Sequence, residues 1–218
     1  MTDYSKQTAL IDKTCSSAPV IPVLTIERVE DAVPMAKALV AGGLPVLEVT
    51  LRTENALAAI EAIAKNVPDA IVGAGTILNP TDFDAAVAAG SQFIVSPGIT
   101  LELLDHAVKQ EVPLLPGIHS VSEMMEGIAR GLTRFKFFPA ELSGGVPALA
   151  AMAGPFGNIR FCPTGGVKVH TAANYLAQPN VMCVGGTWLT PKDLVDNGEW
   201  DKVEQLAREA VEATKAAA

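Results

Sequence analysis

The chain has 218 residues, of which 49% are hydrophobic and 18% charged, and its formal net charge is −8. This length fits one domain or two small ones, and the hydrophobic content excludes a disordered chain. The negative charge disfavours nucleic acid and anionic membranes as partners, although a local positive site for an anionic substrate is compatible with it. Aromatic residues make up only 5%, which favours an aliphatic core like that of parallel sheets.

The first residues, Met1 to Gln7, contain no positive segment followed by an apolar stretch, and no apolar run in the chain reaches membrane-spanning length. Cys15, Cys162 and Cys183 are odd in number and far apart, so we interpret them as small buried hydrophobic residues. We therefore expect a reduced, soluble, cytoplasmic protein.

Strand-like apolar runs alternate with helix-like stretches along the chain, beginning with a predicted helix at Leu10–Cys15. Successive strands begin 19 to 26 residues apart, which is the length of one strand, one helix and two short loops. The predicted strands are Val20–Leu24, Leu44–Thr50, Ala70–Gly75, Phe93–Ser96, Val112–Leu115, Phe135–Phe138, Ile159–Cys162 and Val181–Val184. An amphipathic helix around Val203–Val211 closes the series.

Eight βα repeats fit either a closed (β/α)₈ barrel or an open doubly wound sheet. An open sheet usually carries a Gly-rich phosphate turn after its first strand, and Leu24–Glu27 contains none. The phrase Gly73-Ala-Gly75 lacks a third glycine and follows the third strand, so it is better interpreted as a turn. We predict one α/β domain over residues 1–218, a (β/α)₈ TIM barrel whose bottom is closed by the N-terminal helix.

Lys136 lies within Arg134-Phe-Lys-Phe-Phe-Pro139 and is the only lysine flanked on both sides by strand-type apolar residues. Burial disfavours an ammonium, and a neutral amine can condense with a carbonyl to form a Schiff base. Glu48 is the only acid inside a predicted strand. If both strand faces point inward, the amine and a proton-transferring carboxylate share the interior. A structural ion pair is the alternative, although such pairs are weak sources of stability.

Reactive groups of a barrel collect at the carboxyl ends of its strands, and phosphate usually binds after strands seven and eight. Those strands end in Pro163-Thr-Gly-Gly166 and Gly185-Gly-Thr187. Paired glycines allow backbone N–H groups to approach a phosphate, and helix starts add partial positive charge. Either pair could instead form only a tight turn, but their adjacent positions favour a phosphate site.

Other candidate residues also follow strand ends. Arg52 lies just beyond the second strand, where its guanidinium suits a substrate carboxylate, although an exposed loop arginine is the alternative. The Thr76 hydroxyl could bond a carboxylate or keto oxygen. Ser96-Pro97-Gly98 and Pro116-Gly117 are interpreted as rigid turns that wall the site.

The histidines do not suggest a metal site. His106 and His170 lie on or beside predicted helices, and His119 follows the end of the fifth strand. One candidate ligand per site is too few for a catalytic zinc, so no metal is expected.

Several long phrases make nearly the whole chain resemble the 2-keto-3-deoxy-6-phosphogluconate (KDPG) aldolase and 4-hydroxy-2-oxoglutarate aldolase family, which are class I aldolases. These phrases are Leu47-Glu-Val-Thr-Leu-Arg-Thr53, Val72-Gly-Ala-Gly-Thr76, Phe135-Lys-Phe-Phe-Pro-Ala-Glu141, Arg160-Phe-Cys-Pro-Thr-Gly-Gly166 and Gly185-Gly-Thr-Trp188. The resemblance implies a carbon–carbon lyase of the Entner–Doudoroff pathway that cleaves KDPG to pyruvate and glyceraldehyde 3-phosphate. It also implies cleavage of 4-hydroxy-2-oxoglutarate to pyruvate and glyoxylate.

By the same resemblance, Lys136 is the Schiff-base lysine and Glu48 the general acid/base. The resemblance implies a role in substrate binding for a larger group: carboxylate contacts from Arg52 and Thr76, packing by Pro97 and Phe138, contact with the aldehyde portion by Thr164, and phosphate binding by Gly165, Gly166, Gly186 and Thr187. It implies a homotrimer with no cofactor and no metal.

The chain departs from the family pattern at two positions, because serine is common where it has His119 and Thr187. Thr187 keeps a hydroxyl, whereas His119 could change the mouth of the site. Two other functions remain open at this stage. One is a phosphosugar isomerase or epimerase that uses Glu48 as base, and the other is a non-catalytic barrel that binds phosphorylated metabolites.

Overall fold

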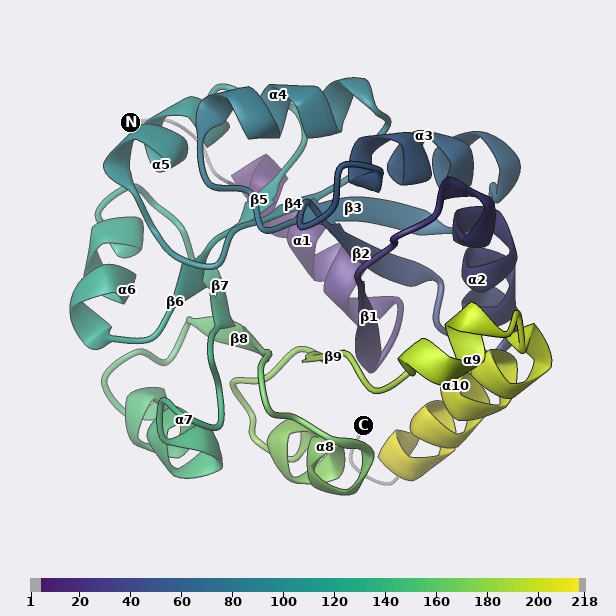
Figure 1. Cartoon of the computed structure of the whole chain (residues 1–218). Helices are drawn as coiled ribbons and strands as arrows, with labels where there is room; N and C mark the ends of the chain where they lie inside the picture. The colour runs from purple at the N-terminus through teal and green to yellow at the C-terminus, as the bar shows by residue number, and fades with distance from the viewer. Residues whose placement is uncertain (1–4, 216–218) are drawn as a thin grey trace.

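The structure is a computed structural model that describes residues 5–215, and within them strands and helices alternate along the chain (Figure 1). The strands are β1 Val20–Leu24, β2 Val46–Thr50, β3 Ile71–Gly75, β4 Ile94–Val95, β5 Leu114–Leu115, β6 Gly117–Ile118, β7 Arg134–Phe137, β8 Arg160–Pro163 and β9 Val184–Gly186. The helices are α1 Ser5–Ser16, α2 Val29–Ala41, α3 Ala56–Asn66, α4 Pro80–Ala88, α5 Leu101–Ala107, α6 Val121–Ile128, α7 Gly145–Ala153, α8 Val169–Leu176, α9 Lys192–Asp196 and α10 Trp200–Thr214. None of these helices is both long enough and apolar enough to cross a bilayer.

The fold is α/β, but the prediction of a closed eight-stranded TIM barrel is wrong. The strands form two parallel sheets, one of six strands in the order β5-β4-β3-β2-β1-β9 and one of three in the order β6-β7-β8. One break falls at Pro116, which separates β5 from β6 along the chain and has no N–H to donate to a neighbouring strand. At the other break, only the isolated bridges Phe161–Val181 and Thr164–Gly185 link β8 toward β9.

The ends of several predicted strands also differ from those observed. β4, β5 and β6 have two residues each, and β6 was not predicted as a separate strand. The last strand was expected at Val181–Val184 but is found at Val184–Gly186. Its glycines were expected in a phosphate-binding loop that follows the strand, whereas Gly185 and Gly186 are part of the strand and pair with Ile21 and Pro22 of β1. Glycine residues do not favour a strand in the sequence pattern. Their place in β9 depends on pairing with the buried strand β1, which the sequence pattern does not show.

Both faces of the larger sheet are covered. Every residue of β1 and β2 is buried, as expected for parallel strands with apolar side chains on both faces. Figure 1 shows the helices α2 to α8 and α10 arranged around the strands. α10 packs closely on α2 at Gly42, where an added Cβ would lie 2.3 Å from the Cβ of Ala207. The core is largely aliphatic, as the composition predicted.

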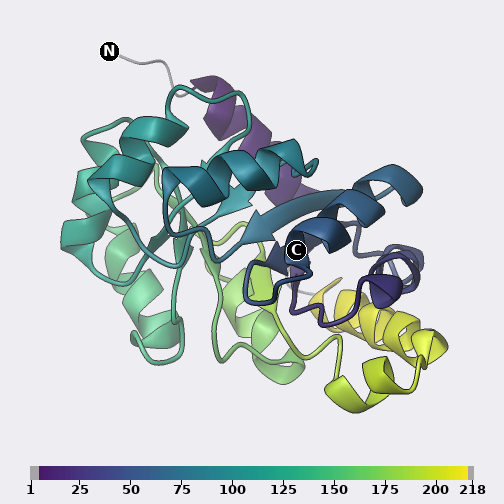
Figure 2. The same ribbon diagram turned by 45° about the horizontal axis from the view of Figure 1, so that its top comes forward.

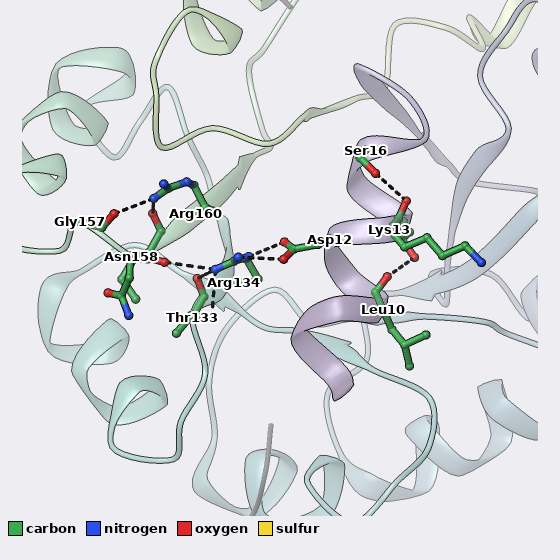
Figure 3. A network of polar contacts seen from close by, with 11 residues as sticks. Leu10, Asp12, Lys13, Ser16, Thr133, Arg134, Gly157, Asn158 and Arg160 are labelled. Atoms are coloured by element: carbon green, nitrogen blue, oxygen red, sulfur yellow. Dashed lines mark hydrogen bonds and ion pairs between the residues drawn. The ribbon is translucent and has the colours of Figure 1, made fainter. Parts of the chain in front are cut away.

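The N-terminal helix lies at the amino ends of the strands, and Figure 2 shows it projecting at one side of the molecule. Arg134 begins β7 and forms a two-pronged ion pair with Asp12 of α1, with Nε–Oδ1 at 2.5 Å and Nη2–Oδ2 at 2.9 Å (Figure 3). The same guanidinium donates to the carbonyl oxygens of Thr133 and Asn158. The predicted helix at Leu10–Cys15 is therefore part of α1, and it is anchored to a strand of the smaller sheet.

Candidate active site

Lys136 and Glu48 meet between the two sheets. Glu48 is the central residue of β2 in the larger sheet, and Lys136 lies on β7 in the smaller one. The lysine Nζ is 3.0 Å from Oε1 of Glu48, and their side chains are 6% and 5% exposed. The expectation that the two side chains share the interior is confirmed by this contact.

Glycine on the neighbouring strand makes room for the carboxylate. An added Cβ at Gly75 of β3 would lie 2.2 Å from Oε1 of Glu48 and 2.8 Å from its Cδ. Thr50 is buried two residues after Glu48, and its hydroxyl donates to the carbonyl oxygen of Leu24 at 2.8 Å. The Glu48 side chain is therefore confined by a close strand on one side and directed toward Lys136.

Two residues expected to pack around a substrate lie near Lys136, one in contact with it and one against its neighbouring strand. The Nζ atom is 5.3 Å from the ring centroid of Phe138, within the range of a cation–π contact. Gly117 pairs with Lys136 across β6 and β7, and an added Cβ there would lie 2.4 Å from the carbonyl oxygen of Pro97. Phe138 thus lies at the lysine itself, and Pro97 lies against the neighbouring strand β6, at the residue that pairs with Lys136.

Arg52 and Thr76 follow the neighbouring strands β2 and β3. Nε of Arg52 lies 3.4 Å from the Thr76 hydroxyl, and the arginine is exposed. Thr76 has φ +62°, the only positive φ among the non-glycine residues described. A β-branched residue in this left-handed region is strained, and such strain gathers at functional sites. The strained backbone places the hydroxyl next to the guanidinium.

The glycine pairs at Gly165-Gly166 and Gly185-Gly186 lie close to Phe138 and Thr164. Thr164 is buried, and its Oγ1 would be 2.3 Å from an added Cβ at Gly185, which faces it across an isolated bridge. Gly165 and Gly166 have φ of +97° and +83°, a conformation that favours glycine. An added Cβ at Gly165 would lie 3.2 Å from the Phe138 ring.

Gly186 is the last residue of β9, and Thr187 follows it. An added Cβ at Gly186 would lie 2.1 Å from the ring of Trp188, so the indole packs directly on this glycine. Thr187 is exposed, and it lines a cleft of about 620 Å³ together with Thr25, Arg28, Arg52 and Lys192. The carboxyl ends of β1, β2 and β9 therefore open onto one cleft, which is also lined by Glu27, Asp31 and Asp196. Arg28 pairs with Asp31 and Lys192 with Asp196.

The histidines lie apart from one another. Nδ1 of His119 is 2.9 Å from Oε2 of Glu123, and Nε2 of His106 is 2.7 Å from Oδ1 of Asp84. No group of three or more His, Cys, Asp or Glu side chains within residues 5–215 is suited to a metal ion. The imidazole of His119 is 61% exposed and pairs with the helix-capping acid of α6.

The three cysteines are buried free thiols, as predicted. Hydrogen bonds with Cys15 and Cys162, followed by burial, raise the pKa of Cys183 well above its ordinary value. Thiols in such surroundings are unreactive and serve as packing groups.

Similarity to known proteins shows the family to which the chain belongs. A family model described as KDPG and KHG aldolase matches residues 11–206. The 2-dehydro-3-deoxy-phosphogluconate aldolase of Pseudomonas aeruginosa is 55% identical over 212 residues, which cover 97% of this chain and 96% of that protein. The chain belongs to the KDPG and KHG aldolase family.

Other members of the KDPG and KHG aldolase family are equally similar. The KHG/KDPG aldolase of Escherichia coli K12 is 56% identical over 200 residues, covering 92% of this chain and 94% of that one. A KDPG aldolase structure from Legionella pneumophila, with pyruvate captured at low pH as a covalent carbinolamine intermediate, has a TM-score of 0.90 and 47% identity, covering 92% and 97% of the two chains. A structure from Zymomonas mobilis with 3-phosphoglycerate has a TM-score of 0.90 and 52% identity, covering 95% and 97%.

Sequence reasoning did not identify the neighbours that shape this aldolase-family site. The steric role of Gly75 was missed, although the glycine stands in the phrase Val72-Gly-Ala-Gly-Thr76. The strained backbone of Thr76 left no signal in the sequence, because non-glycine residues rarely adopt a positive φ.

Proposed function

We propose that the chain is a Schiff-base aldolase that cleaves KDPG to pyruvate and glyceraldehyde 3-phosphate and 4-hydroxy-2-oxoglutarate to pyruvate and glyoxylate. The observation that carries this proposal is the buried contact between Nζ of Lys136 and Oε1 of Glu48 at 3.0 Å. A neutral amine attacks carbonyl carbon, and a carboxylate within hydrogen-bond reach can take its proton and return it.

In the proposed reaction, Lys136 attacks the C2 keto carbon and forms a carbinolamine. Glu48 delivers a proton to the C2 hydroxyl, water leaves, and a protonated imine forms. Glu48, now ionised, accepts the proton of the C4 hydroxyl as the C3–C4 bond breaks and the C4 carbonyl forms. The electron pair of that bond forms the C2–C3 double bond and neutralises the imine nitrogen, so the aldehyde departs and an enamine remains on Lys136. Protonation at C3 and addition of water then release pyruvate and restore the amine.

Substrate recognition is proposed to use both ends of the site. Arg52 and Thr76 bind the carboxylate beside the keto group, and Pro97 and Phe138 pack around the bound keto acid. Thr164 contacts the aldehyde portion. The phosphate binds the turns at Gly165-Gly166 and Gly186-Thr187, where close backbone approach is possible.

The relatives support this assignment. The pyruvate carbinolamine in the Legionella enzyme is the first covalent species expected on Lys136, and the Zymomonas enzyme holds a phosphorylated three-carbon acid. An isomerase that used Glu48 as base would give Lys136 no covalent role. A non-catalytic binding protein would need neither of the two buried groups.

We also propose that three copies associate and that the protein works in the cytoplasm. Exposed apolar side chains gather at or near helix starts that follow strand carboxyl ends, for example Leu101 of α5 and Val121 and Met125 of α6. Val121 and Met125 are one helical turn apart and share a face, which suits burial against another copy. Light scattering should give three chain masses.

Borohydride trapping tests the covalent step. Incubation with pyruvate and borohydride should attach pyruvate to the peptide that contains Lys136, and mass spectrometry should locate it there. Lys136→Ala should abolish both trapping and turnover. Lys65→Ala is the matched control, because Lys65 pairs with Glu61 on the surface of α3, and it should trap normally. An adduct on another lysine, or no adduct, would contradict the proposal.

A further inference from the structure

A buried tyrosine that the proposed chemistry does not use lies behind the Gly165-Gly166 turn. Tyr175, on α8, is 1% exposed, and its hydroxyl donates to Oε1 of Glu141 at 2.7 Å. Burial, and then the hydrogen bond with Glu141, raises the pKa of Tyr175. The hydroxyl therefore remains a donor at neutral pH and fixes the position of one carboxylate.

Glu141 packs against the turn itself. An added Cβ at Gly166 would lie 2.6 Å from Cγ of Glu141 and 2.7 Å from its Cβ. The backbone N–H of Glu141 donates to the carbonyl oxygen of Gly165 at 3.1 Å, and that of Ala140 donates to Thr164 at 2.8 Å. The segment that follows β7 thus supports the turn through both its backbone and the stem of Glu141.

The negative charge of Glu141 makes the direction of its carboxylate important for an anion that binds at Gly166. The N–H of Gly166 makes no backbone hydrogen bond within residues 5–215, so it is available to a ligand. A carboxylate that turned toward this N–H would compete for it and would repel an anion at the same place. The hydrogen bond from the Tyr175 hydroxyl holds Oε1 of Glu141 and so keeps it from the N–H of Gly166.

We propose that Tyr175 and Glu141 are positioning residues that hold the Gly165-Gly166 turn in the shape that recognises the substrate phosphate. The inference rests on the proposed phosphate role of this turn. It predicts that the pair acts on phosphorylated substrates and has little effect on the chemistry at Lys136.

Comparison of two substrates tests the pair. In Tyr175→Phe, KM for KDPG should rise about tenfold with little change in kcat, since one hydrogen bond to a charged group is lost. kcat/KM for 4-hydroxy-2-oxoglutarate, which has no phosphate, should stay within about twofold of the parent value. Pyruvate release coupled to lactate dehydrogenase measures both. Glu141→Ala should also raise KM for KDPG selectively, because it removes the side-chain stem that packs against Gly166. Glu141→Gln, which keeps the stem and an oxygen acceptor, should raise KM much less.

Thr214→Val is the matched control, because Thr214 is also buried and donates to a backbone carbonyl, far along α10. It should change neither KM. Equal losses on the two substrates in Tyr175→Phe and Glu141→Ala would overturn the inference in favour of general structural damage, and so would unchanged KM for KDPG. Absence of pyruvate release from either substrate by the parent chain would instead refute the proposed function. If Tyr175→Phe does not fold, Glu141→Ala decides alone, because Glu141 is exposed.

Discussion

Lys136 and Glu48 belong to different sheets, and a single contact of 3.0 Å between Nζ and Oε1 joins them. β2 and β7 share no ladder, so this contact depends on how the two sheets face each other rather than on strand pairing. Both side chains are almost completely buried, which excludes bulk water from the place where a proton would move between them. The pair can therefore exchange a proton directly.

Replacing Glu48 with Gln should keep the shape and remove the proton acceptor. We expect kcat for KDPG cleavage to fall by about 10²- to 10⁴-fold, the usual contribution of general acid–base catalysis. Trapping of pyruvate by borohydride should slow as well, because imine formation also needs proton transfer. Glu48→Asp, with a carboxylate one methylene shorter, should retain more activity than Glu48→Gln. A Glu48→Gln enzyme with normal kcat would contradict the assignment.

Gly75→Ala should displace the same carboxylate without altering its chemistry. The new Cβ would lie 2.2 Å from Oε1, 2.7 Å from Cγ and 2.8 Å from Cδ of Glu48, so the whole side chain must move. Catalysis is sensitive to shifts of this size, and we expect kcat to fall about 10²-fold. Gly154→Ala is the control, since nothing lies within 4 Å of an added Cβ there. Unchanged kcat and KM in Gly75→Ala would contradict the prediction that catalysis depends on the observed position of the Glu48 carboxylate.

Arg52→Ala should affect substrate binding more than chemistry. Its guanidinium lies at the Thr76 hydroxyl and opens onto the cleft, well placed for a carboxylate. Loss of a charge-assisted hydrogen bond should raise KM for both keto acids by about 10- to 100-fold, because both substrates carry that carboxylate. Arg52→Lys should recover part of the loss, as a point charge without the fork. A KM change for only the phosphorylated substrate would place Arg52 at the phosphate instead.

Local patterns predicted the buried contact between Lys136 and Glu48 better than they predicted the arrangement of the sheets. Lys136 and Glu48 were found because a charge within an apolar strand is rare, and alternation was enough to orient both. The prediction of a closed barrel was wrong, because the strands β4, β5 and β6 have only two residues each and carry almost no periodic signal from which their ends could be predicted. The role of Gly75 depends on a contact across strands, which a single sequence does not contain.

Acid should weaken the cap of α6. Partial burial would raise the pKa of Glu123, but hydrogen bonds from the N–H groups of His119 and Ser120 outweigh it and lower the pKa below its ordinary 4.5. Because the pKa of Glu123 is lower in the folded chain than in the unfolded chain, its carboxylate contributes its full stabilisation above the ordinary pKa. That stabilisation is lost as the pH falls through the folded-state pKa. Glu123→Gln should therefore cost about 1 kcal/mol of unfolding free energy at pH 7 and less near pH 3, measured by urea unfolding. A cost that grows with acidity would refute the cap.

Asp12→Asn should loosen the N-terminal helix while sparing the site. Asp12 binds the Arg134 guanidinium through two oxygens, and Arg134 is 19% exposed, so the arginine loses a partner that water replaces poorly. We expect the free energy of unfolding to fall by roughly 1–3 kcal/mol. Lys6→Ala is the matched control, because its ion pair with Glu111 also ties α1 to the body but is exposed, and it should cost less than about 1 kcal/mol. Arg134 lies two residues before Lys136 on β7, at the opposite end of the strand from the glycine turns. The kcat of Asp12→Asn should therefore match the parent below its unfolding temperature, and a loss of kcat there would mean that α1 helps to place the lysine.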